Sequence, residues 1–271
     1  MKTGDILRYL DRQIPPALQE SYDNSGLQAG NPDDEAVAAL LTIDVTEDVV
    51  DEAFKHGCNI IISHHPVIFF PLKRVSTGTP AERIVMSALQ KGITIYSAHT
   101  SLDSVHGGVS FGMAGRLGLK DVEVLSPVRD KLVKLVTFVP HDHLDRVRDA
   151  IFSAGAGHIG NYDRCGFHAE GSGSFRGSDE SSPFVGEKGE MHSEPEARFE
   201  TILPSFLTGQ VVKALLTVHP YEEPAFDLYP LLNEWKGAGL GCVGTLENEM
   251  DEKSFLGLCK KTFSPCCLRD R

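Results

Sequence analysis

Two adjacent histidines, His64 and His65, interrupt an apolar run in the segment IISHHPVIFF. A buried strand has no packing reason to carry two imidazoles side by side. A third histidine, His99, and a carboxylate, Asp103, follow a second apolar run, ITIYSA. Imidazole nitrogen and carboxylate oxygen are a common ligand set for zinc, iron, manganese and nickel. The four residues therefore predict a divalent metal site.

The adjacency of the two histidines bears on how such a site is built. Successive side chains of an extended segment point to opposite sides, so His64 and His65 do not easily bind one ion together. They could serve two ions, about 3.5–4 Å apart as in hydrolytic two-metal sites, or one could orient the other. The alternative is that the histidines end a strand and bond to the backbone, and that Asp103 only caps a helix.

The elements that must position these residues alternate between strands and helices. Apolar strands are predicted at 37–46, 59–63, 93–98 and 122–126, and helices at 47–57, 81–92 and 107–119. This alternation predicts an α/β core with a parallel sheet that helices cover on both faces. Ligands collect at the carboxyl ends of such strands. The histidine pair and the 99–103 segment are therefore expected at the same edge of the sheet.

The character of the chain changes near residue 127. Strands at 131–140, 164–171, 173–177, 197–204 and 223–231, with helices at 141–155 and 205–218, resemble a ferredoxin-like α+β unit with an extra strand. Residues 178–196 are polar and are expected as an exposed loop. We therefore predict a first half of the core at 1–126 and an inserted domain at 127–236. A glycine-rich connector and one helix follow at 237–271.

Two further segments contain residues that bind metals elsewhere. HPYEEPAFD, residues 219–227, contains His219, Glu222 and Glu223, but its two prolines favour a rigid turn over a metal site. His158 lies between glycines in SAGAGHIGNYDRC, where a ligand loop and tight loop packing explain the pattern equally well.

Composition narrows the function classes. The formal net charge of −12 argues against nucleic acid and anionic membranes as partners, although it leaves room for a small anionic substrate. Apolar runs fall far short of membrane-spanning length. The six cysteines have no C-x-x-C spacing, and adjacent Cys266 and Cys267 are expected to be incidental. A reducing, cytoplasmic location is the simplest interpretation.

Five segments together resemble a known family. They are YDNSGLQAGNP, GCNIIISHHPVIFFPLKRV, YSAHTSLDSVHGGVS, GAGHIGNYDRCGF and LLTVHPYEEPAFDLYPL. They are similar to the Nif-three-like dinuclear metal centre proteins, also called GTP cyclohydrolase I type 2 homologues. The resemblance covers essentially the whole chain.

The resemblance implies an α/β core holding two divalent ions (Zn, Fe, Mn or Ni) in a toroidal homohexamer. It also implies that residues 127–236 are an inserted PII/CutA-like domain, to which HPYEEP belongs. By this resemblance His64, His65 and Asp103 match metal ligands, and His99 matches a nearby position that could orient a ligand.

One departure from the family pattern affects the expected site. The family's remaining ligands come from a late H-x-x-x-E motif, and no histidine follows His219 in this sequence. The chain is therefore expected to be a truncated or frameshifted member with an incomplete dimetal site. An uncovered sheet edge and apolar face should make it poorly soluble or dependent on a partner.

Three functions remain open from the sequence. The first is a metal-dependent hydrolase of a nucleotide or phosphorylated small molecule, with His64, His65 and Asp103 as ligands. No P-loop or guanine-recognition motif supports GTP in particular. The second is a non-catalytic metal-binding or regulatory protein, because no nucleophile or general base stands out apart from the metal ligands. The third is an inactive truncated member.

Overall fold

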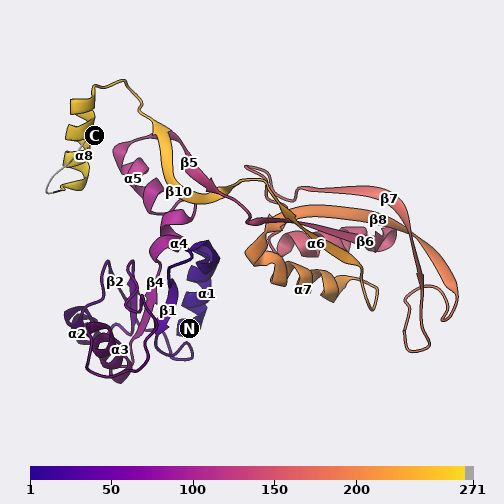
Figure 1. The fold of residues 1–271 in the computed structure, drawn as a ribbon, viewed down its shortest axis with the longest axis horizontal. Helices are drawn as coiled ribbons and strands as arrows, with labels where there is room; N and C mark the ends of the chain where they lie inside the picture. Colours follow the sequence, from indigo (N-terminus) through magenta and orange to yellow (C-terminus); the bar gives the residue numbers. More distant parts are fainter. Residues whose placement is uncertain (266–271) are drawn as a thin grey trace. The chain divides into compact units, whose positions relative to one another are not determined.

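The computed structural model describes residues 1–265, and the chain divides into two compact units (Figure 1). Unit one combines Met1–Ser126 with the chain from Gly237 onward. Unit two is Pro127–Lys236. The adjacent cysteines at 266 and 267 lie outside the described residues.

Unit one is built on a four-stranded sheet with the order β1-β4-β3-β2. Its strands are β1 (Gly26–Ala29), β2 (Ala39–Thr42), β3 (Ile60–Ser63) and β4 (Thr94–Ser97). β2, β3 and β4 are parallel, as the alternating pattern predicts, whereas β1 is antiparallel to β4. Strand β1 was not expected from the sequence, because GLQA is short and begins with a glycine at φ +103°.

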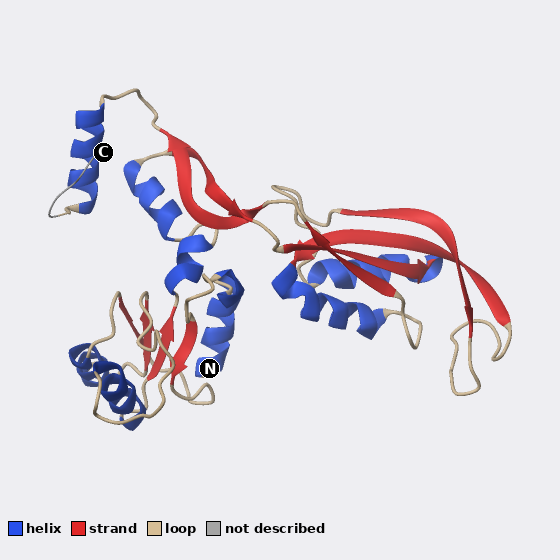
Figure 2. Cartoon of the chain, in the orientation of Figure 1, coloured by secondary structure: helices blue, strands red, loops and turns tan. Residues whose placement is uncertain are grey.

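Helices cover both faces of this sheet (Figure 2). The helices of unit one are α1 (Thr3–Gln13), α2 (Glu47–Lys55), α3 (Pro80–Gln90), α4 (His99–Ser104), α5 (Val109–Leu117) and α8 (Glu252–Phe263), with a 3-10 turn at Pro16–Leu18. Ile61 and Ile95 pack with α2 and α3, whereas their strand neighbours Ile62 and Tyr96 pack with Leu7 of α1. The alternation of side chains along a strand produces these two cores.

Two expectations about unit one were wrong. The fourth predicted strand belongs to β5 (Lys120–Val128), which pairs with β10 (Trp235–Thr245) in a separate two-stranded sheet. β10 occupies most of the segment expected as a glycine-rich connector. Glycines weaken the side-chain pattern by which a strand is recognised in a sequence. Here the segment forms a strand because it pairs with β5.

Unit two has the order β-α-β-β-α-β of a ferredoxin-like fold. Its elements are β6 (Leu132–Pro140), α6 (Leu144–Ser153), β7 (Gly166–Arg176), β8 (Met191–Pro204), α7 (Thr208–Val218) and β9 (Phe226–Leu231), with 3-10 turns at His141–His143 and Ser205–Leu207. The sheet order is β7-β8-β6-β9, and each neighbouring pair is antiparallel.

The sequence pattern predicts one strand more in unit two than the structure contains within residues 1–265. The two short pieces predicted at 164–171 and 173–177 form the single strand β7, whose glycines had suggested a break. Residues 191–196, expected in the exposed loop, belong to β8 and pair with Arg176–Gly171 of β7.

Helices α6 and α7 cover one face of the sheet of unit two. The core between them contains Leu135 and Val139 of β6, Phe199 and Leu203 of β8, and Ile151 of α6. The opposite face of the sheet carries the even-numbered residues of β6 and β8.

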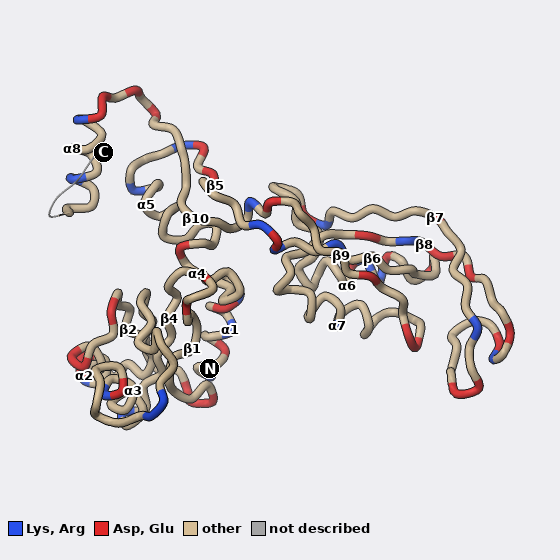
Figure 3. Tube along the Cα trace, viewed as in Figure 1, with Lys and Arg blue, Asp and Glu red and all other residues tan. Residues whose placement is uncertain are grey.

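The described residues contain no helix that is both long and apolar enough to span a bilayer. Acidic residues gather on α2 in Figure 3, where Glu47, Asp48, Asp51 and Glu52 follow one another within nine residues. This distribution agrees with the net charge of −12.

Candidate metal centre

The carboxyl ends of β2, β3 and β4 bring the predicted residues together. Thr42, Ser63 and Ser97 stand in register across these parallel strands. The pairing continues past the strand ends, because the His64 N–H donates to Thr42 O (3.1 Å) and the His99 N–H donates to His64 O (2.9 Å). His64, His65 and His99 therefore share one edge of the sheet.

These three residues form what we call the histidine cluster. The ring centroids of His64 and His65 are 5.0 Å apart, and each lies 5.6 Å from that of His99. His65 is the most open of the three, with a side chain that is 49% exposed, compared with 25% for His64. Imidazoles that approach this closely from two loops indicate a site rather than three separate surface residues.

Carboxylates hold two of the three rings. Asp44 lies 2.7 Å from Nδ1 of His65, and Asp23 lies 2.6 Å from Nδ1 of His99. An ionised carboxylate can only accept a hydrogen bond, so Nδ1 must carry the proton in both rings. A neutral ring held in this way has its lone pair on Nε2, the arrangement by which carboxylates orient histidine ligands of metals.

Asp23 is itself fixed by the surrounding backbone and side chains. Its side chain is fully buried and also accepts from the backbone and hydroxyl groups of Thr100 and from the Ser25 hydroxyl (2.9 Å). Burial raises the pKa of this carboxyl, but hydrogen bonds, led by those from Thr100 and His99, outweigh burial and lower the pKa to about 2. Asp23 therefore stays ionised at neutral pH.

His64 and Asp103 approach each other without a hydrogen bond. His64 Nε2 and Asp103 Oδ1 are 3.8 Å apart. Burial of the imidazole lowers the pKa of His64, an effect that the charge of Asp103 opposes in part. His64 is consequently neutral at pH 7 and has a lone pair to offer.

The sequence interpretation missed Asp23 and Asp44. Asp23 begins the DNSGLQ part of a segment that had been noted only as a family feature. The same segment holds the histidine loop, since Asn24 Nδ2 donates to Ile68 O (2.6 Å) and Ile68 N donates to Gln28 Oε1 (3.1 Å). A carboxylate at the end of the strand before the histidines, such as Asp44, could have been suspected.

The backbone at His99 is strained. Its φ of +26° lies in the left-handed region, which residues other than glycine seldom adopt. Such a conformation costs roughly 1–3 kcal/mol and persists only where its surroundings impose it. Here the Asp23 contact and the His99 N–H bond to His64 O hold the residue in place.

The nitrogen and oxygen atoms of the histidine cluster and Asp103 are of the types that bind divalent ions, but their positions match a metal site only in part. Within residues 1–265, no group of three or more His, Cys, Asp or Glu side chains is arranged to hold a metal ion. Two ligands of one tetrahedral ion with bonds of ~2.1 Å lie about 3.4 Å apart. The 3.8 Å between His64 Nε2 and Asp103 Oδ1 is close to that separation. Nitrogen and oxygen donors with oriented imidazoles are what zinc, iron, manganese or nickel prefer.

The other candidate residues have structural surroundings of their own. His219 is buried in unit two, where its Nε2–H donates to Phe138 O (3.0 Å) and Nδ1 accepts from the Tyr221 N–H (3.1 Å). This is the packed turn that the prolines predict. His158 is exposed, and the neighbouring Gly157 packs so tightly that a Cβ would lie 2.6 Å from the Phe152 ring. Tight packing therefore explains the glycines there.

Comparison with known proteins identifies the family of the chain. The family model Duf34/NIF3 (NGG1p interacting factor 3) matches residues 1–269. The GTP cyclohydrolase 1 type 2 homolog of Halalkalibacterium halodurans is 44% identical over 259 residues, which is 95% of this chain and 70% of the relative. The protein of the same name from Bacillus subtilis is 43% identical over 251 residues, or 92% of this chain and 67% of the relative.

A solved structure points to the same family. The crystal structure of a Bacillus cereus protein related to NIF3 is 40% identical to this chain and superimposes with a TM-score of 0.83. The match covers 98% of this chain and 71% of that protein. Sequence and fold thus agree over nearly the whole length. The chain therefore belongs to the Duf34/NIF3 family.

Proposed function

We propose that the histidine cluster and Asp103 bind a divalent metal ion and that the protein is a metal-dependent hydrolase of a nucleotide or phosphorylated small molecule. His64, His65 and Asp103 are the proposed ligands. His99 stands beside them as the residue that completes the polar wall of the site. A bound divalent ion would supply Lewis acidity toward a phosphoryl or carbonyl oxygen.

One observation carries the proposal: three imidazoles meet at one sheet edge, and two of them are oriented by carboxylates through Nδ1. Hydrogen bonds of this kind fix the ring and raise the basicity of the other nitrogen. A purely structural cluster has no need of such oriented lone pairs. Asp23 and Asp44 are accordingly positioning residues, whose carboxylates aim the rings.

The residues of the chain also suggest where a substrate would lie. Phe69 packs against His99 with a centroid distance of 6.1 Å and against Phe70 at 5.0 Å. Phe70 is 75% exposed and Tyr22 is 65% exposed. Exposed aromatic rings beside a polar cluster offer a stacking surface for a planar base. The name of the curated relatives makes guanine nucleotides a reasonable first choice among substrates.

Metal binding is the first test. The full chain, stripped of metal with a chelator, would be titrated with Zn²⁺, Mn²⁺, Ni²⁺ and Fe²⁺ by calorimetry. We expect His65→Ala to weaken binding at least about tenfold. His106→Ala is the matched control, because His106 is exposed, follows Asp103 by three residues and stands outside the cluster. Equal affinities in the two variants would contradict the ligand assignment.

Turnover is the second test and separates an enzyme from a binder. A panel of nucleotides and phosphorylated small molecules would be incubated with the chain, with and without the metal that binds most tightly. Turnover that needs the metal and disappears in His65→Ala supports the hydrolase. Metal binding without turnover would instead support a regulatory role, and no metal binding at all would indicate an inactive chain.

The proposal also includes the assembly that the family resemblance implies and the location that the cysteine pattern favours. We expect a homohexamer, with a small anionic substrate as the partner of the metal site, in the cytoplasm. Light scattering after size exclusion would give the mass of the particle in solution. A monomer at micromolar concentration would remove the hexamer from the proposal without affecting metal binding.

A further inference from the structure

Unit two contains a cavity of about 600 Å³ on the sheet face that α6 and α7 leave open. Phe138 of β6, Glu196 of β8 and Phe175 of β7 line it, together with the turn that contains Tyr221. The volume lies within the range of pockets that bind small molecules. No residue of the cavity belongs to the histidine cluster, and the proposed hydrolase does not use it.

Missing side chains create the hollow. In β7, Ala169, Gly171 and Gly173 pair with Arg198, Glu196 and Glu194 of β8 and therefore point to the same face. A Cβ on Gly173 would lie 2.2 Å from Glu196 Oε2, so the carboxylate could keep its present position only beside a glycine. The small residues of β7 therefore leave space around a charged group.

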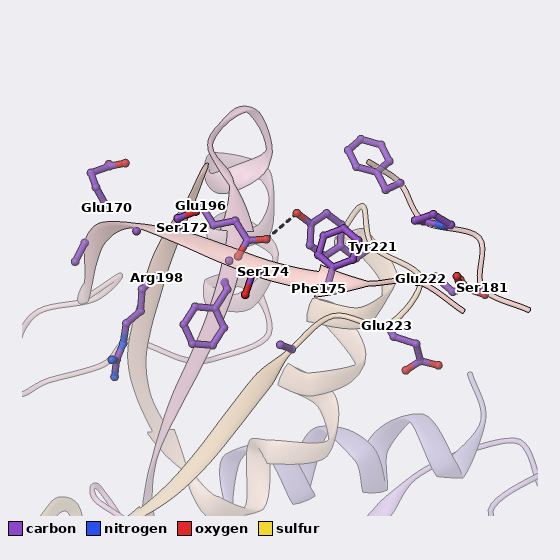
Figure 4. Close-up of a pocket in the computed structure, with 18 residues that line it drawn as sticks. Glu170, Ser172, Ser174, Phe175, Ser181, Glu196, Arg198, Tyr221, Glu222 and Glu223 are labelled. Carbon is purple, nitrogen blue, oxygen red and sulfur yellow. Dashed lines mark hydrogen bonds between the residues drawn. The ribbon is translucent and has the colours of Figure 1, made fainter. Parts of the chain in front are cut away.

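The buried carboxylate of Glu196 also indicates that the cavity binds a ligand. The residue is 94% buried, since its relative exposure is 6%, and it lines the cavity. Its recorded partner within residues 1–265 is the Tyr221 hydroxyl, which donates to Oε1 (2.7 Å), as Figure 4 shows. Oε2 has no hydrogen-bond partner among the described residues. A buried carboxylate without a compensating cation is costly.

The basic side chains on this face are engaged elsewhere. Arg198 points away from Glu196 in Figure 4, and its guanidinium lies 3.6 Å from Glu200. Lys134 also pairs with Glu200 (3.3 Å). Among residues 1–265, therefore, Lys134 and Arg198 both pair with Glu200 and no ion pair neutralises Glu196, so a cationic ligand would complement its charge.

The walls of the cavity favour an organic cation over an inorganic one. The Tyr221 ring lies 6.1 Å from the rings of Phe175 and Phe184, and Phe138 adds a third phenyl group to the lining. Aromatic faces attract weakly hydrated ammonium groups through cation–π interaction. A metal ion would need several oxygen ligands, and the described residues form no such group.

The segment above the cavity is tied down by the turn that follows α7. The Ser182 N–H donates to Glu222 Oε2 (2.7 Å), and Phe184 of the same segment packs against Tyr221. These contacts place Ser181, Pro183 and Phe184 over the open sheet face as part of the lining. The cavity therefore has walls from the sheet, the turn and this segment.

We propose that the cavity binds a small organic cation, a protonated amine on an aromatic or apolar body, with the ammonium beside Glu196. The body would pack among Phe138, Phe175 and Phe184, and the ammonium would donate to the free Oε2. The Tyr221 hydroxyl would keep the carboxylate in place from the other side. Charge complementarity selects this occupant over a neutral or anionic molecule of the same shape.

The test uses the full chain and three probes of similar shape: 2-phenylethylammonium, 2-phenylethanol and phenylacetate. Binding would be followed by chemical-shift changes in the isotopically labelled protein at concentrations up to about 1 mM. We expect the ammonium compound to bind at least about tenfold more tightly than the other two. The shifts should centre on Glu196, Tyr221 and the β7 glycines. No binding by any probe, or equal binding by all three, would overturn the proposal.

Two variants separate direct contact from general charge. Glu196→Gln keeps the shape and the acceptor for Tyr221 but removes the charge, and should abolish the preference for the ammonium. Glu194→Gln is the matched control: Glu194 lies two residues earlier on the same face of β8, bonds to His192 (2.8 Å) and does not line the cavity. An equal loss in both variants would reduce the effect to long-range charge and contradict a contact at Glu196.

A third variant tests the position of the ligand. Gly173→Ala places a methyl carbon 2.2 Å from the position of Glu196 Oε2, so the carboxylate must move, and binding of the ammonium compound should weaken. Circular dichroism and Trp235 fluorescence, which reports on unit two, would establish that the variant is folded. A folded variant that binds as tightly as the wild type would place the ligand elsewhere and overturn the proposal.

Discussion

The histidine cluster of unit one and the cavity of unit two are built in opposite ways. The cluster gathers polar side chains at strand ends, and hydrogen bonds such as the five accepted by Asp23 fix them. The cavity arises where β7 lacks side chains, and its charged group, Glu196, has a single protein hydrogen bond among the described residues. Sites of the first kind are visible in residue types, whereas sites of the second kind become visible only when strands are paired.

The largest expected effect distinguishes a fully bonded carboxylate from a lightly bonded one. Asp23→Ala removes a buried acceptor and should destabilise unit one by about 3 kcal/mol, because several donors lose their partner. Asp44→Ala, whose carboxylate is 67% exposed, should cost less than about 1 kcal/mol. Urea denaturation followed by far-UV circular dichroism would measure both. Similar losses would show that the bonds to Asp23 contribute little.

The pH dependence of the unfolding free energy should also distinguish Asp23 from Asp44. The pKa of Asp23 is lowered from 3.8 to about 2 in the folded chain, so the unfolded chain binds a proton more readily. The resulting stabilisation is complete above pH 3.8 and is lost as the pH falls toward 2. A titration of unfolding free energy in which Asp23→Ala and the wild type show the same slope below pH 3.8 would contradict this assignment.

In unit two the next largest effect involves His219. Burial lowers its pKa from the ordinary 6.5, so the neutral ring favours the folded state above pH 6.5, and this stabilisation is lost as the pH falls below 6.5 through the folded pKa. His219→Phe removes that pH dependence and two hydrogen bonds. We expect it to lower the free energy of unfolding by about 2 kcal/mol near neutral pH. Fluorescence of Trp235, the single tryptophan, follows unit two. The exposed His158→Phe should leave the pH profile unchanged.

Helix starts give a smaller contrast between the units. In unit one, the Thr46 hydroxyl accepts from the Val49 N–H (3.2 Å) at the start of α2, whereas α6 and α7 of unit two begin after 3-10 turns without a side-chain cap. Thr46→Ala should cost about 1 kcal/mol and Thr46→Ser much less. Thermal unfolding would measure both. No difference between alanine and serine would mean that the cap does not stabilise α2.

The smallest effect on stability concerns the edge of the unit-one sheet. Leu41 of the edge strand β2 is 76% exposed, and Ile43 beyond it is 65% exposed. We expect Leu41→Lys to change the free energy of unfolding by less than about 0.5 kcal/mol but to reduce self-association, because a charge protects an open edge. Sedimentation velocity would compare the two proteins. Unchanged association would place the contact surface elsewhere.

How far the sequence predicts the fold differs between the two sites. His64, His65 and His99 could be placed at one edge because apolar runs such as NIIIS mark parallel strands, and parallel strands end together. Asp23 could not be placed, because the strand that follows it, β1, runs antiparallel to β4 and carries almost no pattern in GLQA. Strand β10 was missed for a similar reason: its glycines have no side chains to alternate.

The cavity was beyond the reach of the sequence for a different physical reason. Gly173 and Glu196 are separated by the loop of residues 177–190, and their proximity depends on the register of β7 with β8. Since β6 also holds β8, a slip of β7 by one residue would turn Gly173 to the helix-covered face and bring a serine beside Glu196. The buried carboxylate can therefore be recognised only after this register is known.

The contact between Asp23 and His99 has a consequence for the order of folding. It joins residues 76 positions apart, and it depends on the pairing of β1 with β4. Contacts between distant parts of a chain form late, because the intervening loop must close before they contribute stability. His64 and His65 follow β3, so we expect them to be in place once β2 and β3 pair and His99 to acquire its orienting carboxylate later. During synthesis and refolding, we therefore expect the imidazole pair to be exposed to solvent and to free metal ions before the third ring is fixed beside it.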